Sequence, residues 1–110
     1  MDTQSPILKG IAASQGQAEG AVKIAFTIKD NAKFEEGDVL VTKMTEHSMV
    51  PIMIRASAII TDVGGITCHA AIVSREMGIP CVVATKEATK MLKDGQMVKV
   101  DGTKGEVYLV

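Results

Sequence analysis

The sequence has few aromatic residues, no large excess of either charge and no long apolar run. Its 110 residues include no Trp, one Tyr and two Phe, and the formal net charge is −1 at pH 7. Bases have no aromatic platform to stack on, and the Lys and Arg residues are scattered, so we expect no nucleic-acid partner. No apolar run approaches the ~20 residues of a membrane-spanning helix, so we expect no membrane partner either.

Cysteine is also scarce, and its placement argues against a sulfur-based site. Cys68 and Cys81 form no C-x-x-C pair and have no histidine at the spacing of zinc ligands. We therefore predict no metal site and two thiols that stay reduced. Because no signal peptide begins the sequence, this pattern predicts a cytoplasmic protein.

Two larger functional units are missing as well. The sequence has no G-x-x-x-x-G-K-[ST] string for nucleotide phosphates. Its length leaves no room for a (β/α)₈ barrel of ~250 residues. A chain of 110 residues suits one hydrophobic core, so we expect residues 1–110 to form a single domain.

Short apolar runs separated by glycine predict mostly strands. We expect strands within residues 7–16, 18–26 and 35–44, buried strands at 58–61 and 81–84, and a closing hairpin from 97–102 and 105–110. Helices are predicted over residues 48–57, 68–77 and 86–94. The pattern indicates a compact α/β unit of packed layers, with mostly short strands and about three helices.

The candidate site combines one strand, one turn and one helix. The apolar run at residues 58–61 leads into Gly64 and Gly65, and His69 follows in the first turn of the predicted helix. The first N–H groups of a helix have no internal partners and carry the positive end of its dipole. Glycines allow an anion to approach them closely, so this arrangement predicts stabilisation of an anion beside His69.

The ends of this helix follow from capping residues, and its histidine has a chemical use. Thr67 is the predicted N-cap, and Gly78 and Pro80 end the helix. A neutral imidazole nitrogen is nucleophilic near pH 7 and forms a phosphoramidate that can pass its phosphoryl group on. A lone histidine on a helix is more often structural, however, so spacing alone leaves both roles open.

The string that surrounds His69 is more specific. Residues 64–75, Gly-Gly-Ile-Thr-Cys-His-Ala-Ala-Ile-Val-Ser-Arg, resemble the phosphohistidine signature of the phosphoenolpyruvate-utilising enzyme family. The stretches VLVTKMTEHSMVPIM before it, and REMGIPCVVAT and LKDGQMVKVDGTKGEVYL after it, are also similar to members of that family. The resemblance extends over residues 10–110 and is closest to phosphoenolpyruvate synthase and pyruvate phosphate dikinase.

The resemblance implies a swivelling, mobile domain of β/β/α type whose phosphoryl carrier is His69. In the family, such a histidine moves phosphoryl between a nucleotide-binding domain and a barrel domain that binds phosphoenolpyruvate or pyruvate. ATP and Mg²⁺ would belong to those partner domains or subunits, and this chain is expected to bind no cofactor. The resemblance further implies a phosphotransferase component that does not turn over alone and works either as part of a larger enzyme or beside separate subunits.

Supporting roles in the phosphate site fall on Gly64, Gly65, Thr67, Cys68 and Arg75. Thr67 matches the threonine that can be phosphorylated for regulation in dikinases, and the alternative is a plain N-cap. Gly65 is expected to permit close backbone approach, or else to serve a turn without a ligand. Arg75 has either a phosphate-binding or docking role or a structural ion pair. Cys68 is expected to lie at the helix start with no catalytic role.

Two positions depart from the family pattern. His47 lies where synthases usually have proline, and we predict that it is an exposed loop residue. Ile66 lies where synthases and dikinases often have arginine or methionine, so the subgroup stays open.

Two other functions remain open beside the phosphoryl carrier. One is a non-catalytic anion-binding or regulatory module with the same fold. The other is a scaffold in which the glycine and histidine string is structural, which leaves the histidine at the helix start unexplained.

Overall fold

The strands form one sheet that curls into two layers. The computed structural model describes residues 5–110. Its strands are β1 (Leu8–Lys9), β2 (Ile11–Ser14), β3 (Gln17–Ile24), β4 (Val39–Thr42), β5 (Ala58–Thr61), β6 (Cys81–Val83), β7 (Met97–Asp101) and β8 (Glu106–Leu109). They lie in the order β1-β8-β7-β3-β4-β5-β6-β2.

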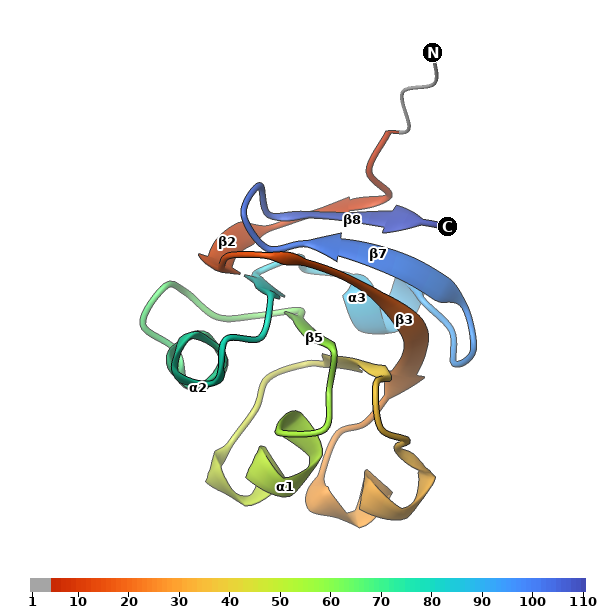
Figure 1. Cartoon of the computed structure of the whole chain (residues 1–110), viewed down its shortest axis with the longest axis vertical. Helices are drawn as coiled ribbons and strands as arrows, with labels where there is room; N and C mark the ends of the chain where they lie inside the picture. The colour runs from red at the N-terminus through yellow and green to blue at the C-terminus, as the bar shows by residue number, and fades with distance from the viewer. Residues whose placement is uncertain (1–4) are drawn as a thin grey trace.

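The helices add a third layer. The α-helices are α1 (Val50–Met53), α2 (His69–Met77) and α3 (Ala88–Met91), and the 3₁₀ helices are η1 (Ile28–Lys33) and η2 (His47–Met49). Antiparallel strands β7 and β8 form one layer, parallel strands β4, β5 and β6 the next, and α1 and α2 lie on the far side of the parallel layer (Figure 1). This is the predicted β/β/α arrangement.

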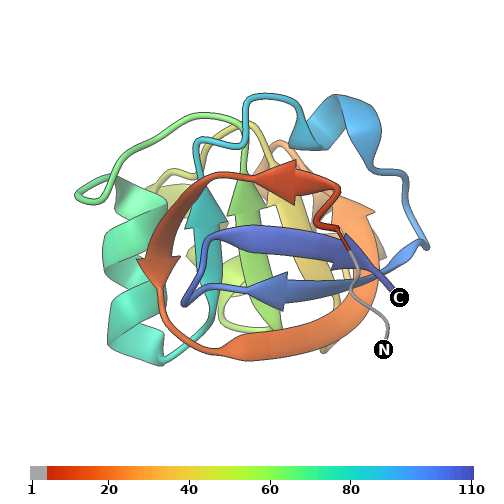
Figure 2. The same cartoon turned by 90° about the horizontal axis from the view of Figure 1, so that it is seen from above.

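Strand β3 joins the two sheet layers. Residues 17–21 pair antiparallel with β7, and residues 22–24 pair parallel with β4. In Figure 2 the blue strands β7 and β8 cross over the yellow-to-cyan parallel strands. At the other end of the sheet only Gly10 separates β1, paired with β8, from β2, paired with β6. A Cβ at Gly10 would lie 2.2 Å from the Val83 carbonyl oxygen, so this closure of the sheet needs glycine.

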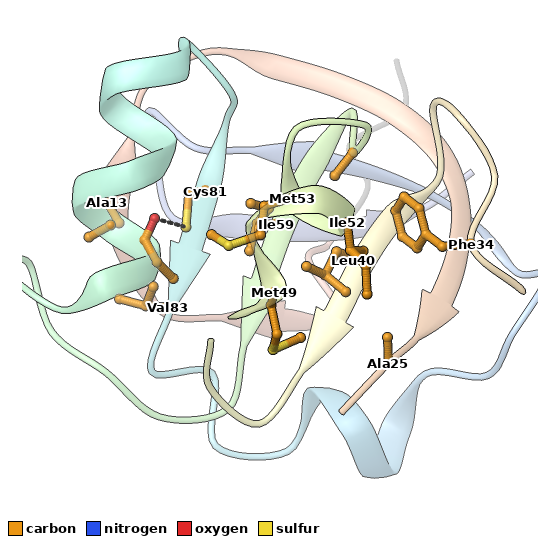
Figure 3. Close-up of a cluster of buried hydrophobic side chains, with 13 residues drawn as sticks. Ala13, Ala25, Phe34, Leu40, Met49, Ile52, Met53, Ile59, Cys81 and Val83 are labelled. Carbon is orange, nitrogen blue, oxygen red and sulfur yellow. Dashed lines mark hydrogen bonds between the residues drawn. The ribbon is translucent and has the colours of Figure 1, made fainter. Parts of the chain in front are cut away.

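The parallel strands are buried on both faces, as their continuous apolar runs predict. Side chains alternate along each strand, so Val41 and Ile60 face the antiparallel layer while Leu40 and Ile59 face the helices. Figure 3 shows the helix-side cluster, in which Leu40 and Ile59 lie beside side chains that include Met49, Ile52 and Met53. Each such fully buried side chain contributes roughly 1.5–3 kcal/mol.

The predicted strands agree with the structure more closely than the predicted helices do. Strand β5 occupies the predicted residues 58–61, and β7 and β8 form the predicted hairpin. The helix predicted over 48–57 is shorter and consists of η2 followed by α1, with Pro51 in its first turn. The helix predicted over 86–94 contains only Ala88–Met91 in the structure.

Backbone geometry explains the shortened α3. Ala84 and Lys86 have φ values of 59° and 75°, outside the right-handed helical region. The Lys86 N–H donates to the Asp62 carbonyl oxygen, and the Asp62 carboxylate accepts from the Thr89 N–H and hydroxyl. These bonds hold the start of α3 against the end of β5, and Leu92 then turns to extended backbone.

Candidate functional site

The site lies where the chain leaves parallel strands β4 and β5. The loops that follow these strands are hydrogen-bonded to each other, because Asp62 and Val63 donate their N–H groups to the carbonyl oxygens of Thr42 and Lys43. His69 is the first residue of α2 and is partly exposed. The carboxyl edge of the parallel strands is where α/β sheets commonly place ligand sites.

Thr45 fixes the His69 ring. The Thr45 hydroxyl and His69 Nδ1 form a hydrogen bond of 2.7 Å, and the Thr45 residue is only 4% exposed. The other ring nitrogen, Nε2, is not part of this bond. The residue spacing does not predict the contact, since Thr45 lies 24 positions before His69 on the loop after β4. Only the parallel pairing of β4 with β5 brings the two loops together.

The helix begins one residue later than predicted. Cys68 is the N-cap and makes no side-chain cap bond, so the predicted N-cap role of Thr67 is wrong. The Cys68 N–H donates to the Gly65 carbonyl oxygen and closes a turn, which leaves Thr67 exposed within that turn. The first helical bond runs from the Ile72 N–H to the Cys68 carbonyl oxygen.

An uncapped start leaves donors free at the site. Among the described residues, the backbone N–H groups of His69, Ala70 and Ala71 precede the first helical bond and receive no side-chain cap. Such groups carry the positive end of the helix dipole. The predicted helix-start donors are therefore present on the residue that carries the imidazole and on the two that follow it.

The two glycines before the helix differ in what they require. Gly64 has a φ of 137°, and a Cβ there would lie 2.9 Å from the Cys68 sulfur. A Cβ at Gly65 would meet nothing within 4 Å. Glycine at 64 is therefore needed for backbone conformation and for contact with Cys68, whereas the space beside Gly65 is open.

Arg75 holds the site loop in place. Its guanidinium donates from Nη1 to the Ala13 carbonyl oxygen at 2.9 Å and from Nη2 to the Ile66 carbonyl oxygen at 2.7 Å. Its partners are backbone carbonyls rather than the carboxylate of the predicted ion pair. The side chain therefore connects α2 to β2 and to the turn before His69.

Two cavities border the His69 ring. One of about 640 Å³ lies between α2 and the η2–α1 segment, and His47 lines it together with His69. The His47 ring centroid is 6.3 Å from that of His69. His47 is exposed, as predicted, but it belongs to the 3₁₀ helix η2 rather than to a loop. The other cavity, of about 110 Å³, contains Thr45 and Cys68 in its wall.

The cysteines differ in surroundings. Cys68 is partly exposed at the helix start, and Cys81 is fully buried in β6. Burial raises the pKa of the Cys81 thiol to about 11, so it stays protonated at neutral pH.

Within residues 5–110 no group of three or more His, Cys, Asp or Glu side chains is placed to hold a metal ion. No helix in the same range is long and apolar enough to cross a membrane.

This fold and site define a class of protein: a β/β/α domain that presents one histidine at the start of a helix. The family follows from comparison with known sequences. Residues 34–105 match the model of the PEP-utilising enzyme, mobile domain, and the chain belongs to that family.

Relatives of the chain are longer proteins. Over 102 residues it is 64% identical to the "Probable phosphoenolpyruvate synthase" of Archaeoglobus fulgidus, a match that covers 93% of this chain and 14% of the relative. It is 62% identical to the phosphoenolpyruvate synthase of Pyrococcus furiosus, covering 93% of this chain and 12% of that protein. The chain thus spans about one seventh or less of the length of these relatives.

A solved structure supports the same family at lower identity. The solution structure of Enzyme I (nEIt) aligns with a TM-score of 0.60 and 36% identity, over 68% of this chain and 31% of that one. Together with the synthase relatives, this likeness places the chain among mobile domains of the phosphoenolpyruvate synthase and Enzyme I type.

Proposed function

We propose that the chain is a phosphoryl carrier and that Nε2 of His69 is the atom that takes up and releases the phosphoryl group. The observation that carries this proposal is the 2.7 Å bond between the Thr45 hydroxyl and His69 Nδ1. In the tautomer that we propose for the carrier, Nδ1 donates its proton to the Thr45 oxygen and the lone pair is on Nε2.

The proposed step balances without a bound cofactor in this chain. The Nε2 lone pair forms an N–P bond, the P–O bond of the donor breaks, and the leaving group keeps that electron pair. The ring then carries a positive charge, which its Nδ1–H shares with the Thr45 oxygen. Imidazole is both a good nucleophile and a good leaving group, so the reverse step delivers the phosphoryl group to an acceptor.

The helix start favours the phosphorylated form. The N–H groups of His69, Ala70 and Ala71 lie in the first turn of α2, so their positive field acts on an anion carried by the same turn. Cys68 and Gly65 have only a structural part in this arrangement, because they set the turn that exposes those donors.

The donor and acceptor sites belong to partner domains or subunits. We propose a nucleotide-binding partner that supplies ATP and Mg²⁺, and a barrel partner that binds phosphoenolpyruvate or pyruvate. Support comes from the length of the synthase relatives, of which this chain covers 12–14%. Exposed apolar side chains beside the site, including Met44, Val63 and Ile66, provide a surface for docking.

Regulation at Thr67 is a further part of this proposal. Thr67 is exposed and two residues before His69, and no N-cap bond occupies its hydroxyl. A phosphate there would place a second dianion beside the carrier position and oppose phosphorylation of His69 by charge repulsion.

The test is transfer of a labelled phosphoryl group. The chain is incubated with labelled ATP or phosphoenolpyruvate and the remainder of the Archaeoglobus fulgidus relative, prepared without its matching segment. We expect acid-labile, base-stable label on the wild-type chain and none on His69→Gln. No label with an active partner, or equal label on His69→Gln, would overturn the proposal.

The uncapped helix start also favours a second candidate, an anion-binding or regulatory module. In that case phosphate would bind the chain reversibly and leave no covalent label. The His69→Gln variant would bind phosphate equally well. The same two proteins therefore separate the two candidates.

A further inference from the structure

His47 is close to the site but has no part in the proposed function so far. It begins η2, its side chain is exposed, and its ring centroid is 6.3 Å from that of His69 with the planes at 43°. Both imidazoles line the cavity of about 640 Å³ between α2 and the η2–α1 segment. Two histidines occur in the whole sequence, and the fold brings them together from positions 22 residues apart.

Side chains that can carry a positive charge are scarce in the two cavity walls beside His69. In the part of the chain that the structure describes, no Lys or Arg lines either cavity beside the His69 ring. Arg75 is on the same helix, but its guanidinium donates to the Ala13 and Ile66 carbonyl oxygens. His47 is therefore the only other side chain in these two cavity walls that can carry a positive charge.

The orientation of the His69 ring also supports a contact between His47 and a group carried by Nε2. Nδ1 is bonded to Thr45, which lines the smaller cavity, whereas His47 lines the larger one. In an imidazole ring Nε2 lies on the side away from Nδ1. With the centroids 6.3 Å apart, an oxygen of a group carried by Nε2 would be within reach of His47 for a charge-assisted N–H···O bond of about 2.7–2.9 Å.

We propose that His47 is a phosphate-contacting residue, and that its protonated imidazole donates a hydrogen bond to an oxygen of the phosphoryl group on His69 Nε2. This inference rests on the proposed function, since it needs a phosphoryl group at His69. No covalent step is assigned to His47. It supplies one positive charge to a dianion that meets no Lys or Arg in the two cavity walls beside His69.

Protonation of His47 and phosphorylation of His69 are then coupled. The other titratable groups near His47 are Glu46, which precedes it, and Glu76 and His69 of α2. A phosphoryl dianion on His69 would add a negative charge beside the His47 ring and attract its imidazolium form. Phosphorylation should therefore raise the pH at which His47 is half-protonated by about half a unit, and His47 should lower the corresponding pH of the phosphoryl group equally.

The experiment uses the full 110-residue chain and phosphoramidate, a chemical phosphoryl donor that needs no partner protein. Wild type, His47→Gln and His69→Gln are phosphorylated and titrated between pH 5.5 and 8.5. Phosphorus NMR follows the phosphoryl group, and the ring protons of His47 are followed in wild type before and after phosphorylation. His69→Gln identifies any signal from a phosphoryl group on His47 itself.

We expect the phosphoryl titration of wild type to lie about half a pH unit below that of His47→Gln. The His47 ring in wild type should shift upward by a similar amount, a readout that needs no variant. Equal phosphoryl titrations in the two proteins, an unmoved His47 ring, or modification of His47 alone would overturn the proposal. If the titrations of His47 and of the phosphoryl group affect each other as expected but enzymatic transfer fails, the result counts against the proposed function only.

Discussion

At the scale of single residues, the site depends on a hydroxyl that orients an imidazole. Thr45 is buried and bonded to Nδ1, which leaves Nε2 as the nitrogen that we propose for phosphoryl transfer. The histidine itself was predictable, because the string around it is specific to a family. Thr45 was not, because its role depends on the pairing of β4 with β5 and on no local pattern.

Replacing Thr45 with valine tests this bond. Valine keeps the shape but removes the hydroxyl, so the His69 ring loses its hydrogen-bond partner, including the acceptor for Nδ1–H in the charged state. A bond to a charged group contributes about 1.5–3 kcal/mol, so transfer to His69 should slow roughly ten- to a hundredfold. Thr45→Ser keeps the hydroxyl and should retain most of the rate. Single-turnover labelling measures both, and equal rates for valine and wild type would exclude the role.

Gly64 and Gly65 form a matched pair for a stability test. Gly64→Ala should lower the free energy of unfolding by about 1–3 kcal/mol, because alanine is strained at a φ of 137° and meets the Cys68 sulfur. Gly65→Ala should leave stability nearly unchanged, since its Cβ enters open space. Urea unfolding of both variants is the measurement. A Gly64→Ala protein as stable as wild type would contradict the backbone assignment.

The buried thiol of Cys81 makes stability depend on pH. Its pKa rises from 9.0 to about 11 on folding, mainly through burial. The unfolded chain therefore loses its proton first, and stability falls as pH rises from about 9 to about 11. Wild type should lose about 2 kcal/mol over this range relative to Cys81→Ala. Parallel urea unfolding curves that show no difference in pH dependence would contradict this.

At the scale of elements, strands were predicted better than helices, for a physical reason. Runs such as residues 58–61 are apolar on both faces and have few alternatives to a buried strand. Short helices depend on caps and on the neighbouring loops. α3 is short because Lys86 is left-handed and Leu92 is extended, and α2 starts at His69 because the Cys68 N–H closes a turn on Gly65.

Arg75 offers a test at this scale, because it joins α2 to β2 and to the turn before His69. Arg75→Ala should lower the free energy of unfolding by about 1–2 kcal/mol through two lost hydrogen bonds. Hydrogen exchange of residues 64–68 should also accelerate. Glu76→Ala, one position further along the exposed side of α2, serves as the control. Unchanged exchange in Arg75→Ala would show that the turn holds without it.

At the scale of the whole molecule, the two sheet layers and the helices hold the carboxyl edge of the parallel strands, where the site loops lie. The antiparallel layer buries the parallel strands from one side and the helices bury them from the other, so the loops at the strand ends are held by packing. The resemblance of residues 64–75 was enough to predict this architecture. It did not predict that His47, from a position where the family pattern has proline, would lie beside His69.

The most direct measurement for the carrier proposal is the position of the phosphoryl group on the ring. The chain is phosphorylated by transfer from phosphoenolpyruvate or ATP through the partner domains, with the histidines labelled with ¹⁵N. Nitrogen–phosphorus NMR correlations then identify the bonded nitrogen. We predict a single phosphoryl group on Nε2 of His69, with Nδ1 still bonded to Thr45. A phosphoryl group on Nδ1, on another residue, or on none would contradict it.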